Sequence, residues 1–405
     1  MKQSHQMGRV EFVALMAMLG GVVAYSIDAM LPALPQIGAE LSPDAINRAQ
    51  LVVTSFVFGM GIGTFFVGPF SDAFGRKPVI LAGAAIYALA TLLALLAPSL
   101  ELLVLARILQ GLGVSAARIV SMAIIRDLYA GREMARLMSF VTMVFTLVPA
   151  IAPLIGSGII AIAGWRGVFA SFLIFAAIYS LWMSLRLREP LRLEDRCPFH
   201  PASLRQAVKE VLSDRVVLMS ITVQTLCFAA LFASLSSIQQ IMGDSYDRAA
   251  QFPYWFAMIA LIAGGASLMN AALVMHFGMR QLISTALSAQ ILLCLLALVL
   301  FQTNLSSGMG FAVYIAWQAS VFSMVSLTLG NLTSLAMEPL GHIAGMAASV
   351  ISGLSTVGSV LLAVPIGLSF DGTPLPLILG VLGCMCLGRI LMLRLAAREK
   401  LAEEG

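Results

Sequence analysis

Long apolar runs recur along almost the whole chain, separated by short polar segments or by breaks that contain glycine and proline. An α-helix needs about 20 apolar residues to cross the core of a bilayer. A transmembrane β-barrel would instead show segments of about ten residues with alternating hydrophobicity, and the sequence does not show them. The pattern predicts an all-α membrane protein with twelve spans, near 10–31, 48–68, 79–97, 101–125, 138–162, 167–187, 215–240, 251–275, 281–300, 308–333, 344–368 and 374–395.

Positive charges collect in every second loop of this pattern. If the N-terminus is cytoplasmic, the outer loops contain only Arg48, Arg166 and Arg248, and the other loop arginines and lysines lie on the cytoplasmic side. Cytoplasmic loops of membrane proteins are enriched in Lys and Arg, so we expect both termini in the cytoplasm. The formal net charge of +4 therefore reflects topology and gives no reason to expect a nucleic-acid partner.

One sizeable polar segment, residues 188–214, lies near the midpoint of the chain. Within it, Ser203 and Gln206 have the spacing of a capping box, and apolar residues follow at helical spacing. We expect a cytoplasmic linker with a short amphipathic helix on the membrane surface. It would separate a six-helix bundle over 1–187 from a second one over 215–405, and both halves carry Phe-Gly ahead of a basic residue after their second span.

Composition supports a membrane protein and argues against several other classes. Hydrophobic residues make up 60% of the chain and charged residues 11%, whereas about a quarter of a soluble protein is charged. The five cysteines and four histidines show no metal-binding or disulfide spacing. A glycine-rich phosphate loop with a lysine is missing, which disfavours an ATP-driven pump. We expect no metal and no cofactor.

The segment from Gly68 to Pro78 reads Gly-Pro-Phe-Ser-Asp-Ala-Phe-Gly-Arg-Lys-Pro. Its glycines permit a tight turn, and the final proline suits the first turn of the next helix. Asp72 could accept hydrogen bonds from a helix N-terminus or pair with an arginine across the boundary between the halves. This predicts a conformational latch, with an ordinary tight loop as the alternative. The latch would consist of Gly68, Asp72, Gly75, Arg76 and Lys77.

This segment resembles the loop signature of the major facilitator superfamily. The stretch from Arg107 to Gly113 resembles the fourth-helix motif of its proton-coupled members. A third stretch resembles the fifth-helix antiporter motif, although Ala152 and Ser157 stand where the family usually has glycine. The residues that carry this last resemblance are Pro149, Pro153, Gly156 and Gly158.

A narrower resemblance is to the bicyclomycin- and chloramphenicol-resistance (Bcr/CflA) drug:proton antiporters. It is carried by Ser26-Ile27-Asp28 followed by Leu31-Pro32-Ala33-Leu34-Pro35, by the stretch Ala123–Tyr129, and by Gly164-Trp165-Arg166. The resemblance implies a major facilitator fold and a monomer in the bacterial inner membrane. It implies a protein that exports small, largely apolar compounds in exchange for protons.

Asp28 is the only acidic residue that the pattern places well inside a span. Burial disfavours a charged carboxylate, so Asp28 could hold a proton near neutral pH. Arg107 is expected at comparable depth, and its movement would make proton affinity depend on conformation. We expect these two residues to couple protons to transport. In the alternative, Asp28 reaches interfacial water ahead of Pro32, and Arg107 forms a static ion pair or binds a carbonyl.

Arg118 follows Arg107 by eleven residues and therefore lies on the same helix face. An arginine in mid-span costs about 2.5–3.5 kcal/mol on insertion scales, so it should face a wet cavity or the protein interior. It could contact a polar or anionic substrate, or it could form a structural pair. The expected lining of the substrate cavity is Tyr25, Asp28, Arg118, Gln224, Trp317, Gln318 and Asn331. For the polar residues of the second half, interhelical hydrogen bonding is the alternative.

Other functions stay open at this point. Uptake or export of one metabolite, such as an amino acid, peptide or siderophore, fits the same fold, because fold does not determine the substrate. A membrane enzyme or a passive channel is a different class. Substrate, transport direction and proton stoichiometry are not encoded in any motif that we identify.

Overall fold

The computed structural model of the protein describes residues 7–303 and 305–403, and the regular secondary structure of this part of the chain is helical. Its first half contains the helices α1 Arg9–Asp28, η1 Leu31–Ala33, α2 Leu34–Leu41, η2 Pro43–Gln50, α3 Leu51–Phe74, α4 Arg76–Leu95, α5 Leu100–Leu128, α6 Gly131–Arg186 and η3 Leu193–Asp195. Its second half contains α7 Pro201–Ser213, α8 Arg215–Gln240, η4 Ile241–Ser245, η5 Ala249–Gln251, α9 Phe252–Phe277, α10 Met279–Phe301, α11 Ser307–Met337, η6 Glu338–Ile343, α12 Ala344–Leu368 and α13 Leu375–Glu403.

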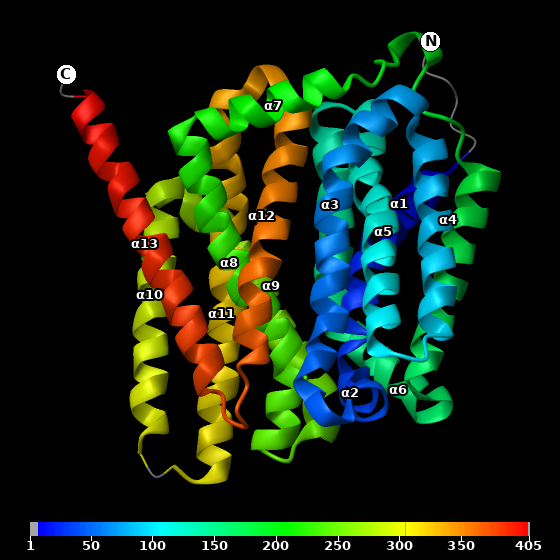
Figure 1. Ribbon diagram of the computed structural model, residues 1–405. Coiled ribbons are helices and arrows are strands. Elements are labelled where there is room, and N and C mark those ends of the chain that lie inside the picture. The colour runs from blue at the N-terminus through cyan, green and yellow to red at the C-terminus, as the bar shows by residue number, and fades with distance from the viewer. Residues whose placement is uncertain (1–6, 304, 404–405) are drawn as a thin grey trace. The chain divides into compact units, whose positions relative to one another are not determined.

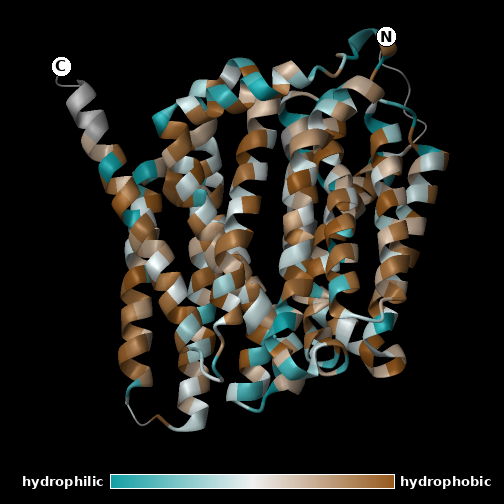
Figure 2. Cartoon of the chain, in the orientation of Figure 1, coloured by the Kyte–Doolittle hydropathy of each residue, from teal (hydrophilic) through white to brown (hydrophobic). Residues whose placement is uncertain are grey.

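Within the described residues, ten helical segments are long and apolar enough to cross a membrane. Apolar residues dominate the middle of the helices, and hydrophilic residues gather at their ends (Figure 2). A helix satisfies its own backbone hydrogen bonds, which is what the bilayer core demands. The predicted all-α membrane architecture is therefore confirmed. Each of the two longest segments contains a break: α6 is interrupted at Gly164 (φ 65°), and the segment Ser307–Leu368 contains η6.

The chain forms two compact units, Met1–Pro201 and Ala202–Gly405. In the first unit, α5 packs along α3 and α4, and α1 packs along α6 (Figure 1). Large side chains such as Leu15, Phe56 and Phe169 are fully buried between these helices. Leu89 and Ile162 are exposed instead, as expected for positions that face lipid.

In the second unit, α8 lies at the centre and packs against α11, α12 and α13 (Figure 1). Helix α10 packs on α11 and α13, while α9 packs on α11. The positions of α8 that face its neighbours are small or apolar, for example Cys227 and Ala230, and both are fully buried. This close packing leaves little room for solvent around the polar side chains that α8 also carries.

Helix α7 is the amphipathic helix that the sequence predicts in the linker. It buries Ala207 and Val211, and the Glu210 carboxylate pairs with His342 Nε2 at 2.5 Å. The helix begins at Pro201, so Ser203 lies inside its first turn and the predicted capping box is wrong. Proline is well suited to a first helical position because its missing N–H has no helical partner there.

Candidate functional site

Asp28 is the last residue of α1, and the helix ends there because Pro32 lies within the next turn. Its side chain is 4% exposed. Among the residues that the structure describes, none donates a hydrogen bond to this carboxylate or forms an ion pair with it. Asp28 is thus enclosed by protein with no counter-charge, an expensive situation for an ionised group.

Helix α6 approaches the α1 terminus closely at Gly156. A Cβ atom on this glycine would lie 2.2 Å from the backbone oxygen of Ala29, the residue after Asp28. Only glycine permits such a contact. Of the other residues in the antiporter-like motif, Pro153 is buried and Pro149 is half-buried. Gly158 is exposed, with nothing near its Cβ position.

The Arg107 side chain on α5 is fully buried and binds neutral groups. Its Nε donates to the Val52 carbonyl at 2.9 Å, its Nη1 to Gln110 Oε1 at 3.0 Å, and its Nη2 to the Ser26 carbonyl at 3.0 Å. The guanidinium also lies 4.3 Å from the centre of the Phe56 ring, a cation–π contact. The structure thus shows Arg107 bound to carbonyl groups, which the sequence analysis gave as the alternative to a role in proton coupling. Through them Arg107 connects α1, α3 and α5.

A buried polar network continues from Arg107. Ser26 Oγ and Tyr87 Oη are 2.7 Å apart, and Gln110 Nε2 donates to Thr91 Oγ1 at 2.6 Å. All four of these side chains are fully buried. Sequence reasoning missed Tyr87 and Thr91, although polar residues within an apolar span were a usable signal.

Arg118 and Tyr25 have different surroundings in the same unit. Arg118 is half-buried, and its Nη1 lies 3.7 Å from Met60 Sδ, a weak acceptor. No carboxylate pairs with it in the described part of the chain. Tyr25 Oη is 2.8 Å from Ser171 Oγ, and its ring packs on Phe172 and Phe175 of α6.

Four predicted cavity residues belong to the second unit, and three of them form interhelical contacts. Gln224 Nε2 donates to Thr333 Oγ1 at 3.2 Å. Trp317 Nε1 donates to Cys294 Sγ at 3.3 Å, and Asn331 Nδ2 donates to Asn270 Oδ1 at 2.8 Å. The fourth, Gln318, is fully buried, and among the described residues neither atom of its amide has a partner.

The predicted latch loop folds around Arg76. Gly75, at φ 104°, lies between the end of α3 and the start of α4, and the Gly68 carbonyl accepts a hydrogen bond from the Ser71 hydroxyl at 2.9 Å. Arg76 Nε donates to Asp127 Oδ2 at 2.7 Å, and Arg76 also pairs with Asp72. In this structure, the ion pair of Asp72 is therefore made inside its own loop.

The N-terminus of α4 is capped by Glu189, which the sequence did not single out. Its carboxylate accepts the backbone N–H groups of Arg76 and Lys77, both at 2.9 Å. The expectation that Asp72 binds a helix N-terminus is therefore wrong for α4. Lys77 Nζ donates to the Leu187 carbonyl at 2.8 Å, which draws the start of the linker toward this loop. No local pattern signals this role of Glu189, because its partners lie more than a hundred residues away.

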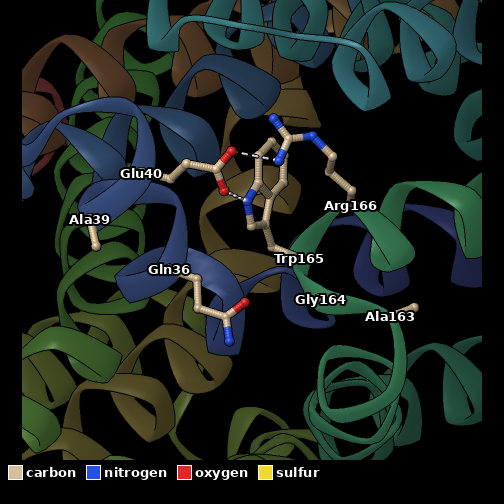
Figure 3. A pocket seen from close by; sticks show the side chains of 7 residues that line it. All are labelled: Gln36, Ala39, Glu40, Ala163, Gly164, Trp165 and Arg166. Carbon is tan, nitrogen blue, oxygen red and sulfur yellow. Dashed lines mark hydrogen bonds and ion pairs between the residues drawn. The ribbon is translucent and has the colours of Figure 1, made fainter.

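At the opposite end of the unit, Glu40 joins α2 to the break in α6. Its carboxylate accepts Trp165 Nε1 at 2.7 Å and pairs with Arg166 Nη1 at 2.6 Å. Figure 3 shows both contacts at the edge of a surface pocket that Gln36 also lines. These contacts fix the segment that follows Asp28.

Comparison with known proteins gives the family. A family model for the Major Facilitator Superfamily matches residues 16–363. The chain is 27% identical to the bicyclomycin resistance protein homolog of Haemophilus influenzae, over 96% of each chain. It is 30% identical to the multidrug resistance protein MdtL of Shewanella oneidensis, over 84% of this chain and 85% of that one.

A solved structure supports the fold independently. The crystal structure of a D-xylose-proton symporter superposes with a TM-score of 0.72 at 16% identity, covering 95% of this chain and 97% of that one. The family model and the named relatives confirm the resemblance inferred from the loop and helix motifs. The match spans most of both units, and the chain belongs to the Major Facilitator Superfamily of membrane transporters.

Proposed function

We propose that the protein is a proton-coupled antiporter of the bacterial cytoplasmic membrane that exports small, largely apolar compounds by alternating access. Relatives named for bicyclomycin, chloramphenicol and multidrug resistance support the substrate class. The observation that carries proton coupling is Asp28, a carboxylate buried without a cation or a hydrogen-bond donor among the described residues.

The proposed topology has twelve crossings, with both termini in the cytoplasm. The ten apolar segments become twelve if the chain reverses direction at Gly164 in α6 and at η6 between α11 and α12. The distribution of Lys and Arg among the loops supports this orientation. Under this proposal, residues 1–187 and 215–405 are six-helix bundles joined by the linker 188–214. The protein acts as a monomer. The proton gradient is its energy source, and it needs no cofactor.

In the proposed mechanism, Asp28 exchanges its proton as its surroundings change. The enclosed carboxylate of this structure favours the neutral, protonated form, because an ionised group without water or a counter-charge is poorly solvated. A conformation that admits water or cargo beside Asp28 favours release of the proton. This difference between conformations links the proton gradient to transport.

Arg107 acts in this scheme as a positioning residue. It binds the carbonyl of Ser26, two residues before Asp28, and the carbonyl of Val52 on α3. These contacts hold the end of α1 at a fixed depth. Arg107 thus acts on Asp28 through the backbone of α1 and not by a direct ion pair. A rearrangement of the Arg107 contacts would move Asp28.

Arg118 and the loop after α3 have separate proposed roles. Arg118 contacts a polar or electron-rich part of the substrate. This role is supported by its half-buried guanidinium, whose only acceptor among the described residues is a sulfur atom. The loop Gly68–Lys77 acts as a conformational latch. This role is supported by the two ion pairs that Arg76 makes, one with Asp72 and one with Asp127.

The test is substrate-driven proton movement in inverted membrane vesicles that contain the full chain. Addition of chloramphenicol to energised vesicles should release protons with the wild-type protein, and dissipating the gradient should abolish chloramphenicol accumulation. An Asp28→Asn variant should lose both responses at normal expression. Asp44→Asn, a neutralised exposed carboxylate in η2, is the matched control and should keep them.

Retention of gradient-driven accumulation by Asp28→Asn would remove Asp28 from proton coupling. Wild-type chloramphenicol uptake that only equilibrates across the membrane, at the same rate with and without a gradient, would exclude antiport and favour a passive channel.

A further inference from the structure

A small cavity lies between the start of α8 and the C-terminal part of α13. Both helices belong to the second unit and pack against each other. The cavity has a volume of about 240 Å³ and is lined by Arg215, Leu218, Met219, Leu391 and Arg394. Drug-sized ligands occupy pockets of about 300–1,000 Å³. This cavity therefore suits one part of a larger molecule whose remainder lies outside the protein.

The lining residues form two layers along the helix axes. Arg215 is the first residue of α8, and Leu218 and Met219 follow about one turn later. On α13, Arg394 follows Leu391 by three residues, which is also about one turn. Because the cavity joins the start of α8 to a late part of α13, the two helices run in opposite directions there. Both arginines thus lie toward the helix ends, and the three apolar residues lie one turn closer to the middle of the helices.

This end of the two helices is where their apolar segments stop. Those segments extend over Arg215–Ser245 and Leu375–Ala397, and the amphipathic helix α7 lies at the same end of the second unit (Figure 1). Phospholipid headgroups lie at this depth, between the apolar core of the bilayer and water. On α13, the side chains of Leu387, Ile390 and Leu393 are exposed, as expected for a surface that lipid covers.

The charges of the two arginines are not balanced by an acidic partner. Both side chains are exposed, and neither forms an ion pair or a hydrogen bond in the described part of the chain. The acidic groups that precede Arg215 are engaged elsewhere. The Asp214 carboxylate accepts two backbone N–H groups at the start of α8, and Glu210 pairs with His342. The cavity therefore presents a net positive charge at the membrane surface.

We infer that this cavity binds the headgroup of an anionic phospholipid. The phosphate lies between Arg215 and Arg394, and the first part of the acyl chains lies on the apolar layer. Arginine offers a planar set of N–H donors that matches the oxygen atoms of a phosphate. Basic pockets between membrane helices on the cytoplasmic side are typical sites for such headgroups. The inference goes beyond the proposed transport function and uses only the proposed cytoplasmic location of this end.

The same residues disfavour two other ligands. A zwitterionic lipid brings an ammonium group together with its phosphate, and none of the residues that line the cavity is acidic. A free phosphate ion would leave the apolar layer in contact with water. An anionic lipid satisfies both layers. Because it contacts α8 and α13 together, its binding stabilises the folded protein.

The test uses phosphatidylglycerol, phosphatidylcholine and glycerol 3-phosphate as probes on the purified full-length protein. Bound lipid is counted by native mass spectrometry during a titration in detergent, and the unfolding temperature is recorded with and without lipid. A double variant, Arg215→Gln with Arg394→Gln, removes both charges of the cavity. The matched control is Arg132→Gln with Arg205→Gln. These two exposed arginines lie outside the cavity and also lack an ion pair among the described residues.

The wild type should bind phosphatidylglycerol more tightly than phosphatidylcholine. In the cavity variant, the Kd for phosphatidylglycerol should rise about tenfold or more, which corresponds to about 1.4 kcal/mol. Without added lipid, this variant should unfold at the wild-type temperature, because both side chains are exposed and unpaired within the described residues. The control pair should keep the wild-type Kd.

A second variant tests the apolar layer. Leu218→Asn changes an exposed side chain, and it should also raise the Kd for phosphatidylglycerol. Glycerol 3-phosphate carries the phosphate without acyl chains, so it should not displace the lipid at equal concentration.

Three results would overturn the inference. An unchanged Kd in the cavity variant would remove the two arginines from lipid binding. An equal rise in the control pair would show only the general attraction between a basic surface and anionic lipid. Displacement by glycerol 3-phosphate at equal concentration would assign the cavity to a soluble phosphate compound. The Asp28 test is separate, because it measures proton movement and not lipid binding.

Discussion

The close approach of α6 to the end of α1 gives a sharp prediction, because two neighbouring glycines of one helix differ in their surroundings. Gly156→Ala would place a Cβ atom 2.2 Å from the Ala29 oxygen, with the carbon atoms of the same backbone at 2.9 and 3.0 Å. A backbone cannot rotate away as a side chain can. Gly158→Ala meets no atom within 4 Å.

The expected magnitude follows from this geometry. Contacts of 3.0 to 3.4 Å are the tightest that real Cβ atoms make, so α6 and α1 must separate by about 0.8 to 1.2 Å in Gly156→Ala. Such overpacking costs about 1–3 kcal/mol. Both variants also gain about 1 kcal/mol of helix propensity. The difference in stability between them therefore isolates the contact, at about 1–3 kcal/mol.

The assay compares thermal unfolding of the two variants and the wild type in one detergent, followed by substrate-driven proton release in vesicles. Gly156→Ala should unfold below Gly158→Ala and should release fewer protons, because the displaced Ala29 adjoins Asp28. Equal unfolding temperatures for the two variants would refute the packing argument. Equal proton release, with a lowered unfolding temperature, would refute the link to Asp28.

Two further predictions concern charged side chains that bind backbone groups. Arg107→Lys should destabilise the protein by about 1.5–3 kcal/mol, because one ammonium cannot reach three acceptors in different directions. As a control, Arg48→Lys at an exposed position should change the unfolding temperature of the protein little. Equal shifts in unfolding temperature for the two variants would contradict the role of Arg107 in holding the helices together. Glu189→Gln should weaken the cap on α4 by about 0.5–2 kcal/mol and speed trypsin cleavage within residues 188–199. Glu194→Gln is the control, and cleavage no faster than in that variant would argue against the cap.

The positions of the membrane helices could be predicted from the sequence almost throughout. Each span depends on a local property, the transfer of about 20 apolar residues into lipid, and this does not require knowledge of the rest of the fold. The expected span 344–368 coincides with α12, and 215–240 coincides with α8. The burial of Asp28 was predictable for the same reason, since its position within an apolar run was visible in the sequence.

The partners of the buried polar groups could not be predicted in this way. Arg107 meets the carbonyl of Ser26, 81 positions away, and the backbone N–H of Arg76 meets the Glu189 carboxylate, 113 positions away. Such a pair depends on the rotation and register of two helices, which the packing of the whole unit determines. The capping box at Ser203 failed through a local competition, because Pro201 starts the helix two residues earlier.

The amino-acid sequence by itself thus determined the class of protein, the apolar helices, the family motifs and the burial of Asp28. Only the tertiary structure decided that Arg107 binds carbonyl groups, that Glu189 caps α4, and that the Gln318 amide has no partner among the described residues. Hydrophobic transfer is a sum over neighbouring residues, whereas a hydrogen bond needs two groups within about 3 Å in the right direction. That geometry exists only once the helices are packed.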